Sequence, residues 1–199
     1  GPLDILRSEL RGNEATGDGG GIQYDSAAGP TGIRSSTLSG NFAAGQGSAV
    51  SSSTNPDQIF FENVTIAHNE APATGSAIRG GLSIVNSLIA ATRVRGSSSS
   101  APNCGSGTTF NSLGYNLDSD GTCGLTGVGD FSSFNAADVL DPVARANGGR
   151  TLTHALVRTG LAVDRSQLGC AFGPDQRGVQ RHQDGNGDGV ARCDIGAYE

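Results

Sequence analysis

The sequence predicts an all-β protein, a parallel β-solenoid of about four rungs followed by a disulfide-stapled C-terminal cap. Three observations lead to this prediction. Segments 8–15, 36–43 and 64–71 repeat one pattern 28 residues apart, apolar residues alternate with polar ones inside each repeat, and glycine occupies 32 of 199 positions. A fixed period of this size indicates one supersecondary unit per repeat, stacked on its neighbours.

Aligning the repeats places apolar residues in four columns. Apolar positions two residues apart are typical of strands, whereas the 3.6-residue period of a helix is absent and glycine disfavours long helices. The columns are Leu3, Thr31 and Ile59; Ile5, Ile33 and Phe61; Leu10, Leu38 and Ile66; and Ile22, Val50 and Ile78. A shortened fourth copy follows at a shift of 23, in which Leu82, Ile84, Ser87 and Ile89 match Ile59, Phe61, Val64 and Ile66.

One polar column runs through the repeats and holds Asn13, Asn41 and Asn69. Asparagine tolerates turn geometry, and its amide can bond to the same residue of the next rung. We expect a structural asparagine ladder at a corner of the solenoid, ending at Thr92. A polar ligand site is the alternative interpretation of this column.

The extent of the 28-residue repeat divides the chain into three predicted regions. Residues 1–92 are expected to form the β-helix repeats, 93–127 a disulfide-closed loop excursion, and 128–199 a C-terminal capping region that covers the unpaired edge of the last rung. Leu3 already occupies a core column, so the first rung shows no cap of its own. We therefore expect that rung to be covered by upstream rungs of a longer protein or by a partner.

The chain has four cysteines: Cys104, Cys123, Cys170 and Cys193. An even number without the close spacing of a zinc site favours two disulfides formed in an oxidising compartment. Three pairings are possible, and the sequential one, Cys104–Cys123 with Cys170–Cys193, closes the shortest loops. Four free buried thiols are the alternative. The expected location is extracellular or at a bacterial cell surface.

The charge pattern argues against two classes of partner. The net charge is −6, all 13 basic residues are arginine, and no basic stripe of the kind that binds nucleic acid is present. No apolar run approaches the roughly 20 residues of a transmembrane segment. We expect neither nucleic acid nor a membrane span.

The strongest local motif is an acidic, glycine-rich stretch at 184–189, where Asp184, Asn186 and Asp188 alternate with glycine. Alternating side-chain oxygens of this kind open calcium-binding loops. Ile195 stands where an EF-hand needs a carboxylate, so we expect a shorter, non-helical calcium site with Asp194 as a further ligand. A surface turn closed by Cys193 is the alternative.

Other polar groups favour structural roles. His68, His154 and His182 lack metal-ligand spacing, and each is expected at the surface or in a turn, with His68 pointing outward. Asp175, Arg177 and Asp194 are expected inside the cap, paired rather than catalytic, because buried arginine–carboxylate pairs favour a structural role.

Two resemblances support this interpretation. Ser36 to Asn41 and Gly75 to Ile78 resemble the right-handed β-helix repeats of bacterial surface proteins, including the polymorphic outer-membrane type, over about residues 3–92. The stretches 147–151, 162–164, 175–178 and 193–199 are similar to the end of bacterial choice-of-anchor Q proteins, over about residues 111–199. The first implies a right-handed helix. The second implies a secreted protein, often with a sorting signal, and no established catalytic residues.

We therefore expect a secreted or cell-surface, non-enzymatic module that serves as a scaffold or in adhesion and binds polysaccharide or a surface protein. The alternative is a polysaccharide lyase or glycoside hydrolase on the same scaffold, which rests on analogy of fold. Lysine is absent, and the carboxylates a hydrolase would draw on form no convincing pair in the sequence. These are Asp25, Asp57, Glu62 and Glu70.

Overall fold

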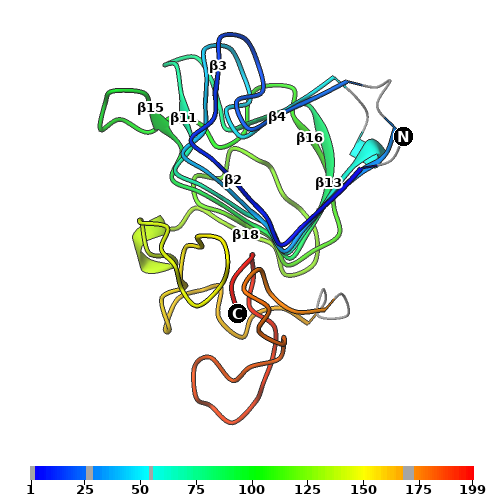
Figure 1. The fold of residues 1–199 in the computed structure, drawn as a ribbon, viewed down its shortest axis with the longest axis vertical. Coiled ribbons are helices and arrows are strands. Elements are labelled where there is room, and N and C mark those ends of the chain that lie inside the picture. Colours follow the sequence, from blue (N-terminus) through cyan, green and yellow to red (C-terminus); the bar gives the residue numbers. More distant parts are fainter. Residues whose placement is uncertain (1–2, 26–28, 54–55, 168–172) are drawn as a thin grey trace.

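The computed structural model describes residues 3–25, 29–53, 56–167 and 173–199. Its strands form four parallel sheets that wind round one axis in about four turns (Figure 1). Within the described ranges the only helices are two short 3-10 turns, η2 (Pro56–Gln58) and η3 (Ala136–Asp138). The predicted all-β parallel solenoid is confirmed. No helix in these ranges is long and apolar enough to cross a membrane.

Successive rungs add strands to four sheets, and sheets A and B extend over more rungs than sheets C and D. Sheet A holds β1 (Leu3–Leu6), β5 (Thr31–Arg34), β9 (Ile59–Glu62), β13 (Gly81–Val85) and β16 (Thr109–Ser112). Sheet B holds β2 (Glu9–Arg11), β6 (Thr37–Ser39), β10 (Thr65–Ala67), β14 (Leu88–Ala90), β17 (Leu117–Asp118) and β18 (Phe131–Ser132). Sheet C holds β3 (Glu14–Ala15), β7 (Phe42–Ala43), β11 (Glu70–Ala71) and β15 (Arg93–Val94). Sheet D holds β4 (Ile22–Tyr24), β8 (Val50–Ser52) and β12 (Ile78–Arg79).

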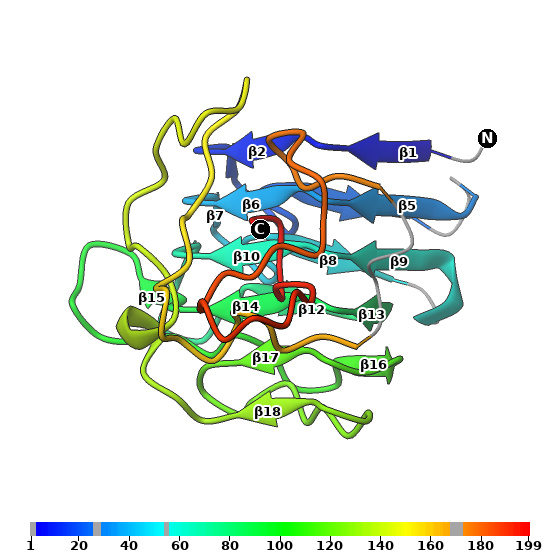
Figure 2. The same cartoon turned by 90° about the horizontal axis from the view of Figure 1, so that it is seen from below.

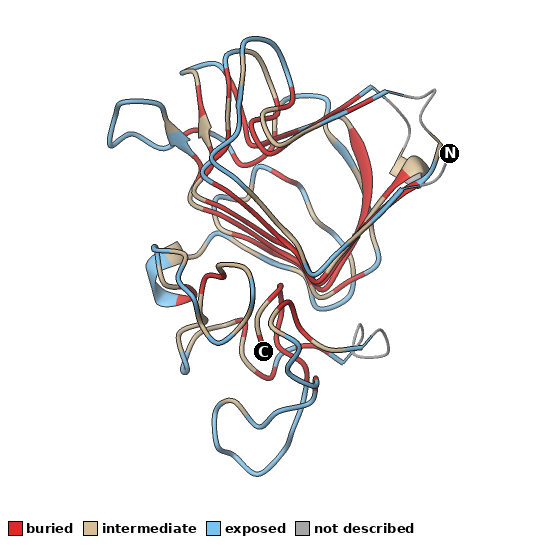
Figure 3. Cartoon of the chain, viewed as in Figure 1, coloured by how far each residue is buried: buried red, intermediate tan, exposed pale blue. Residues whose placement is uncertain are grey.

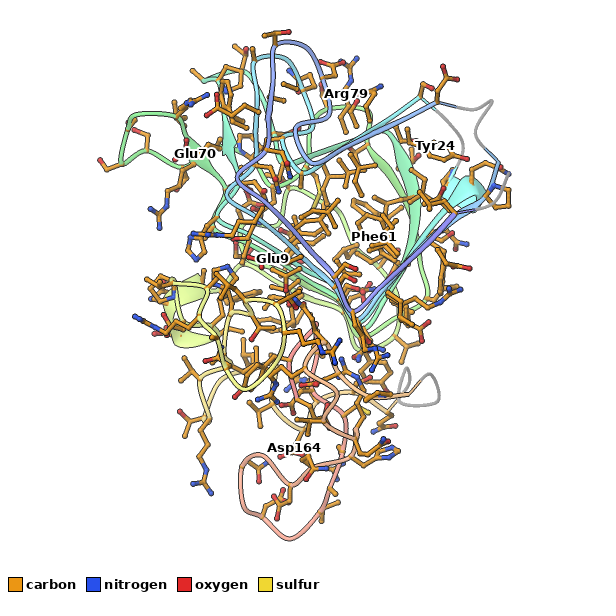
Figure 4. The ribbon with its side chains drawn as sticks, in the orientation of Figure 1. Glu9, Tyr24, Phe61, Glu70, Arg79 and Asp164 are labelled. Carbon is orange, nitrogen blue, oxygen red and sulfur yellow. A yellow bond between two sulfur atoms is a disulfide. The ribbon has the colours of Figure 1, made fainter. Side chains whose placement is uncertain are left out.

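The register of these sheets confirms the predicted columns. Ile33 lies opposite Ile5 and Phe61, and Leu38 lies opposite Leu10 and Ile66. The remaining two columns pair in the same way, and the shortened fourth copy joins at the predicted shift. Ile33, Leu38 and Phe61 are fully buried, and Figure 4 shows Phe61 inside the ring of strands. Burying each such side chain contributes about 1.5–3 kcal/mol.

The asparagine column forms the expected ladder. Asn13 Nδ2 donates to Asn41 Oδ1 at 2.9 Å, and Asn41 Nδ2 donates to Asn69 Oδ1 at 3.0 Å. Thr92 ends the column, where its hydroxyl donates to Asn103 Oδ1 at 2.7 Å. The preceding corner is left-handed in every rung, with φ of +63° at Gly40 and +54° at His68. Glycine adopts this conformation without strain, whereas His68 is held in it by the surrounding rungs.

Parallel pairing continues beyond residue 92, which the repeat period did not predict. Asn111 on β16 lies 28 residues after Ser83, its partner on β13. The next hydrogen-bonded pairs, Ser87 with Asn116 and Asn116 with Asp130, are 29 and 14 residues apart, so the repeat period is no longer constant. The predicted Cys104–Cys123 disulfide is present. Both cysteines belong to the main core cluster, with Phe110 and Leu125 packed against it, so this loop closes the C-terminal end of the interior. Cys193 is also disulfide-bonded, while Cys170 lies outside the described residues.

The final part of the chain lies over the side of the solenoid, whereas we expected it over the last rung. Residues 133–167 and 173–199, here called the cover segment, run along the outer face of sheet B (Figure 2). Gln176 accepts a hydrogen bond from Thr37, and Gly196 N donates to the carbonyl of Asn86. A second core cluster results, in which strand residues such as Leu88 and Ala67 pack with cover residues such as Leu140 and Ile195. The outer face of sheet B thus carries apolar side chains that pack with the cover segment and hydroxyl groups that hydrogen-bond to it.

The first rung is a regular part of the solenoid. Residues 3–6 form β1, which pairs with β5, so the described residues at this end contain no separate capping element. Leu3 and Leu6 are 53% and 52% exposed, unlike the matching Ile59, which is buried. An additional cover over this rung therefore stays a prediction.

Candidate binding site

Most buried charged side chains of the described structure belong to the cover segment. Figure 3 shows the buried stretches of this segment in red. The expected pairing of Arg177 with Asp175 is confirmed, since Arg177 Nε lies 2.8 Å from Asp175 Oδ2. The Arg177 guanidinium also stacks on the Tyr198 ring, 3.6 Å from its centroid. Asp175 in turn accepts hydrogen bonds from the backbone N–H groups of Val179 and Glu199. This carboxylate therefore organises the fold of the cover segment.

A second buried ion pair was not predicted. Arg181 NH1 lies 2.9 Å from Glu199 Oε2, and the two side chains are 1% and 0% exposed. Arg181 also donates to the carbonyl of Gly196, while Glu199 Oε1 accepts from the backbone N–H groups of His182 and Gln183. Every hydrogen-bonding direction of Glu199 is occupied by the protein itself, so the pair is structural.

Two histidines meet in the interface between sheet B and the cover segment, contrary to the expectation of surface positions. His154 is 2% exposed, and its ring lies 5.2 Å from that of His68. His68 does point away from the solenoid interior, but the cover segment lies over it. His182 is exposed in a left-handed turn. Burial lowers the pKa of His68 to about 4 and lowers the pKa of His154 as well.

Ser39 and His154 are in contact as a catalytic serine and its base would be, but their surroundings differ from those of a catalytic pair. Ser39 Oγ lies 2.8 Å from His154 Nε2, and His154 Nδ1 lies 2.7 Å from the carbonyl oxygen of Asp141. The carbonyl can only accept, so Nδ1 carries the proton and Nε2 accepts from the serine. Both side chains are buried, and a carbonyl replaces the usual orienting carboxylate. The contact joins the cover segment to β6.

Asp194 is the most perturbed acid in the described structure. Burial raises its pKa from 3.8 to about 7, with the neighbouring Glu199 and Asp164 acting in the same direction. A hydrogen bond from Asp164 N and the charge of Arg181 oppose this rise. Asp194 and Glu199 line a cavity of about 260 Å³. An acid with a shifted pKa in a cavity is typical of proton-transfer sites. The Glu199 carboxylate, however, is taken up by hydrogen bonds within the protein, so Asp194 has no second carboxylate beside it that is free to react.

The raised pKa of Asp194 predicts a pH dependence of stability. The folded state favours the protonated acid, so this group stabilises the fold most below pH 3.8, and its contribution falls as pH rises toward 7. The lowered pKa of His68 acts oppositely, because its contribution is lost as pH falls from 6.5 to about 4. We expect D194N to remove the first trend, so that its free energy of unfolding rises from pH 4 to 7 relative to wild type. Urea unfolding across this range measures the difference, and parallel curves would contradict it.

The carboxylates considered for a hydrolase do not converge. Asp25 is exposed just after β4, and the Asp57 side chain lies outside the described part of the structure. Glu62 is buried beside Arg34, with 3.4 Å between Oε2 and Nε, and burial raises its pKa. Glu70 lies on sheet C and faces Arg95 at 3.9 Å. The described acids thus sit on different faces of the solenoid, where no two can flank one glycosidic bond.

The acidic loop at 184–189 folds around its own backbone. The Asp184 carboxylate accepts from the N–H groups of Gly187, Asp188 and Gly189, and Asn186 Oδ1 accepts from Asp188 N. Asp194 is instead buried against Asp164 N. Asp164 holds the loop from below through Asn186 N at 2.9 Å (Figure 4 labels Asp164). Within the described residues no cluster of three or more potential ligands is arranged to hold a metal.

A cavity of about 450 Å³ lies where the first rung meets the cover segment. Leu6 and Arg7 line it from the end of β1, and Arg150, Gln176 and Arg177 line it from the cover segment. Three arginines therefore line one space in a chain of net charge −6. No pattern in the sequence indicates this site, because its two halves lie more than one hundred residues apart.

Comparison of the chain with protein-family models, curated proteins and solved structures finds no match. The resemblances to polymorphic outer-membrane repeats and to choice-of-anchor Q proteins stay predictions. The functional argument therefore depends on the geometry of the solenoid and its cover.

Proposed function

We propose that this chain is a secreted or cell-surface, non-enzymatic β-solenoid module, a scaffold or adhesive element that binds polysaccharide or a surface protein. The observation that carries the proposal is the straight rows of outward-facing side chains that stacked rungs create. Successive rungs are about 4.8 Å apart, so each row is a rigid strip of regular spacing. Such a strip suits an extended ligand. The disulfide supports an oxidising, extracytoplasmic location.

Sheet C shows such a row. Glu14 pairs with Phe42, Phe42 with Glu70, and Glu70 with Arg93 across four rungs. Arg95 crosses the row, with its guanidinium 3.9 Å from the Phe42 ring centroid and 2.5 Å from Glu14 Oε1. Arg95 covers one face of the Phe42 ring, and the charged groups of both signs along this row can hydrogen-bond to the hydroxyls of a sugar chain.

A glycan array run beside a reducing-end assay on acidic polysaccharides tests the proposal. Binding without the release of new reducing ends is the expected result. Cleavage would contradict the non-enzymatic assignment and favour the lyase or hydrolase alternative. Binding to neither glycans nor surface proteins of a host or neighbouring cell would contradict the adhesive role.

Calcium binding at Asp184, Asn186 and Asp188 remains part of the proposal. The supporting feature is an exposed, tightly turned loop with three oxygen-bearing side chains on alternate residues. Calcium would have to displace the internal hydrogen bonds of Asp184, so we expect weak, millimolar-range affinity at most. Calorimetry with calcium chloride, using D184N/D188N as the comparison, measures it. Absence of heat at millimolar calcium would end this part of the proposal.

We also propose that the free edge of β1 is covered in the functional assembly by further rungs or a partner. The support is the exposure of Leu3 and Leu6 on an unpaired strand edge, an arrangement that proteins usually protect. Sedimentation of the chain with and without L3K/L6K measures self-association through this edge. Identical monomeric behaviour would exclude a second copy as the cover.

A further inference from the structure

We propose that the cavity between the first rung and the cover segment binds the carboxylate of an acidic sugar. Here it is called the arginine cavity, and it is lined by Leu6, Arg7, Arg150, Gln176 and Arg177. This inference rests on the proposed function, because it names the ligand class that the module takes. The argument starts from the charges that face the cavity.

Two of the three arginines have no acidic partner. Arg177 is neutralised by Asp175, but no carboxylate of the described residues lies within ion-pair distance of Arg7 or Arg150. The cavity therefore carries an excess of positive charge in an otherwise acidic protein. Like charges held near one another are relieved by a bound anion.

The wall behind these charges is rigid. Gln176 accepts from Thr37 Oγ1 at 2.6 Å and donates to Thr151 Oγ1 at 2.9 Å, so its amide is fixed. Arg177 is held by Asp175, by the carbonyl of Asn147 and by the Tyr198 ring. The fixed amide of Gln176 loses little conformational freedom when a ligand binds, whereas the exposed Arg7 and Arg150 side chains become ordered, which lowers the net affinity.

The shape and chemistry of the cavity favour an acidic sugar. A volume of about 450 Å³ falls in the range of small-molecule sites, roughly 300–1,000 Å³. The planar guanidinium fork matches a carboxylate in bidentate geometry. Four of the five lining residues are charged or amide-bearing, which suits a hydroxyl-rich ligand better than an apolar acid.

The test uses the full chain and calorimetry with a trimer of galacturonic acid. We expect binding that weakens as salt rises, and a loss of about tenfold in affinity for R7Q or for R150Q, as a charge-assisted hydrogen bond implies. Glutamine keeps a polar side chain and adopts the φ of +47° at residue 7 as readily as arginine. R165Q, an exposed arginine outside the cavity, is the matched control and should bind as wild type does.

Two comparisons separate this inference from the proposed function. The methyl-esterified trimer lacks the negative charge and should bind far more weakly, and inorganic phosphate should not compete at equal concentration. Equal binding of the ester, equal competition by phosphate, or unchanged affinity in R7Q/R150Q would each overturn the acidic-sugar site. Binding of neutral glycans by R7Q/R150Q would still support the module's adhesive role.

Discussion

Replacing Arg181 by methionine is expected to lower the free energy of unfolding by about 3–5 kcal/mol. Methionine fills most of the same space, so the effect reports the loss of charge. The substitution leaves Glu199 buried without its cation, 2.9 Å from where Arg181 NH1 lay, and removes the donor to the Gly196 carbonyl. It also removes the positive charge that offsets the repulsion between Asp194 and Glu199. Urea unfolding at pH 7 measures the loss.

Two companion variants make the Arg181 result specific. R181M/E199L replaces the pair with apolar groups and is expected to recover a large part of the loss, since an apolar pair of similar volume often matches a buried ion pair. R165Q changes an exposed arginine and should alter stability by less than about 0.5 kcal/mol. A loss below 1 kcal/mol in R181M, or no recovery in the double variant, would show that the pair does not hold the cover segment in place.

The regular rungs could be predicted because local and global patterns agree in them. Leu10, Leu38 and Ile66 share a period, a column and an inward face, and the structure pairs them in that register. The ladder of Asn13, Asn41 and Asn69 followed from the same alignment. Each of these statements needs only residues of neighbouring repeats, so a single sequence contains enough information to make them.

The position of the cover segment could not be predicted, because its contacts have no period. Asn86 bonds to the Asp194 carbonyl across 108 residues, and Glu9 accepts from Leu152 N across 143. The outer face of sheet B gave a weak signal, since Ala67 and Ala90 are small residues that also fit a corner. Small side chains at two successive rungs mark a face that another layer can approach closely, but two alanines alone do not say which part of the chain that layer is.

The candidate site was missed for the same reason. Arg7 and Arg150 are ordinary polar residues in the sequence, and only the fold brings them to one cavity. Arg177 was correctly expected to form an ion pair. The further contact of its partner Asp175 with the Glu199 N–H depends on the path of the cover segment. A site formed between the solenoid and the cover segment can be found only once the tertiary structure is known, whereas a ladder within the solenoid can be predicted from the repeats.

Replacing Asn69 by alanine is expected to cost about 3–5 kcal/mol, the second of the two largest effects. Asn69 Oδ1 accepts both from Asn41 N and from Asn41 Nδ2, at 3.0 Å each. Asn69 Nδ2 donates to the carbonyl of Leu38 at 3.0 Å. Asn41 and Asn69 are both fully buried, so alanine leaves the Asn41 backbone N–H and one N–H of its Nδ2 without a partner in a dry interior, where each costs about 1–3 kcal/mol before relaxation.

The ladder itself supplies the matched control for Asn69. Asn13 belongs to the same column but is exposed at the first rung. N13A removes only the Nδ2 donor to Asn41 Oδ1, and the backbone N–H of residue 13 still donates to that oxygen, so no buried group loses its last partner. We expect a loss of about 1 kcal/mol or less for N13A. E70A tests the neighbouring position of the same rung, where a half-exposed ion pair is worth under about 1 kcal/mol. Equal losses in N69A and N13A would mean that neither the burial of Asn69 nor its additional hydrogen bonds hold the rungs together.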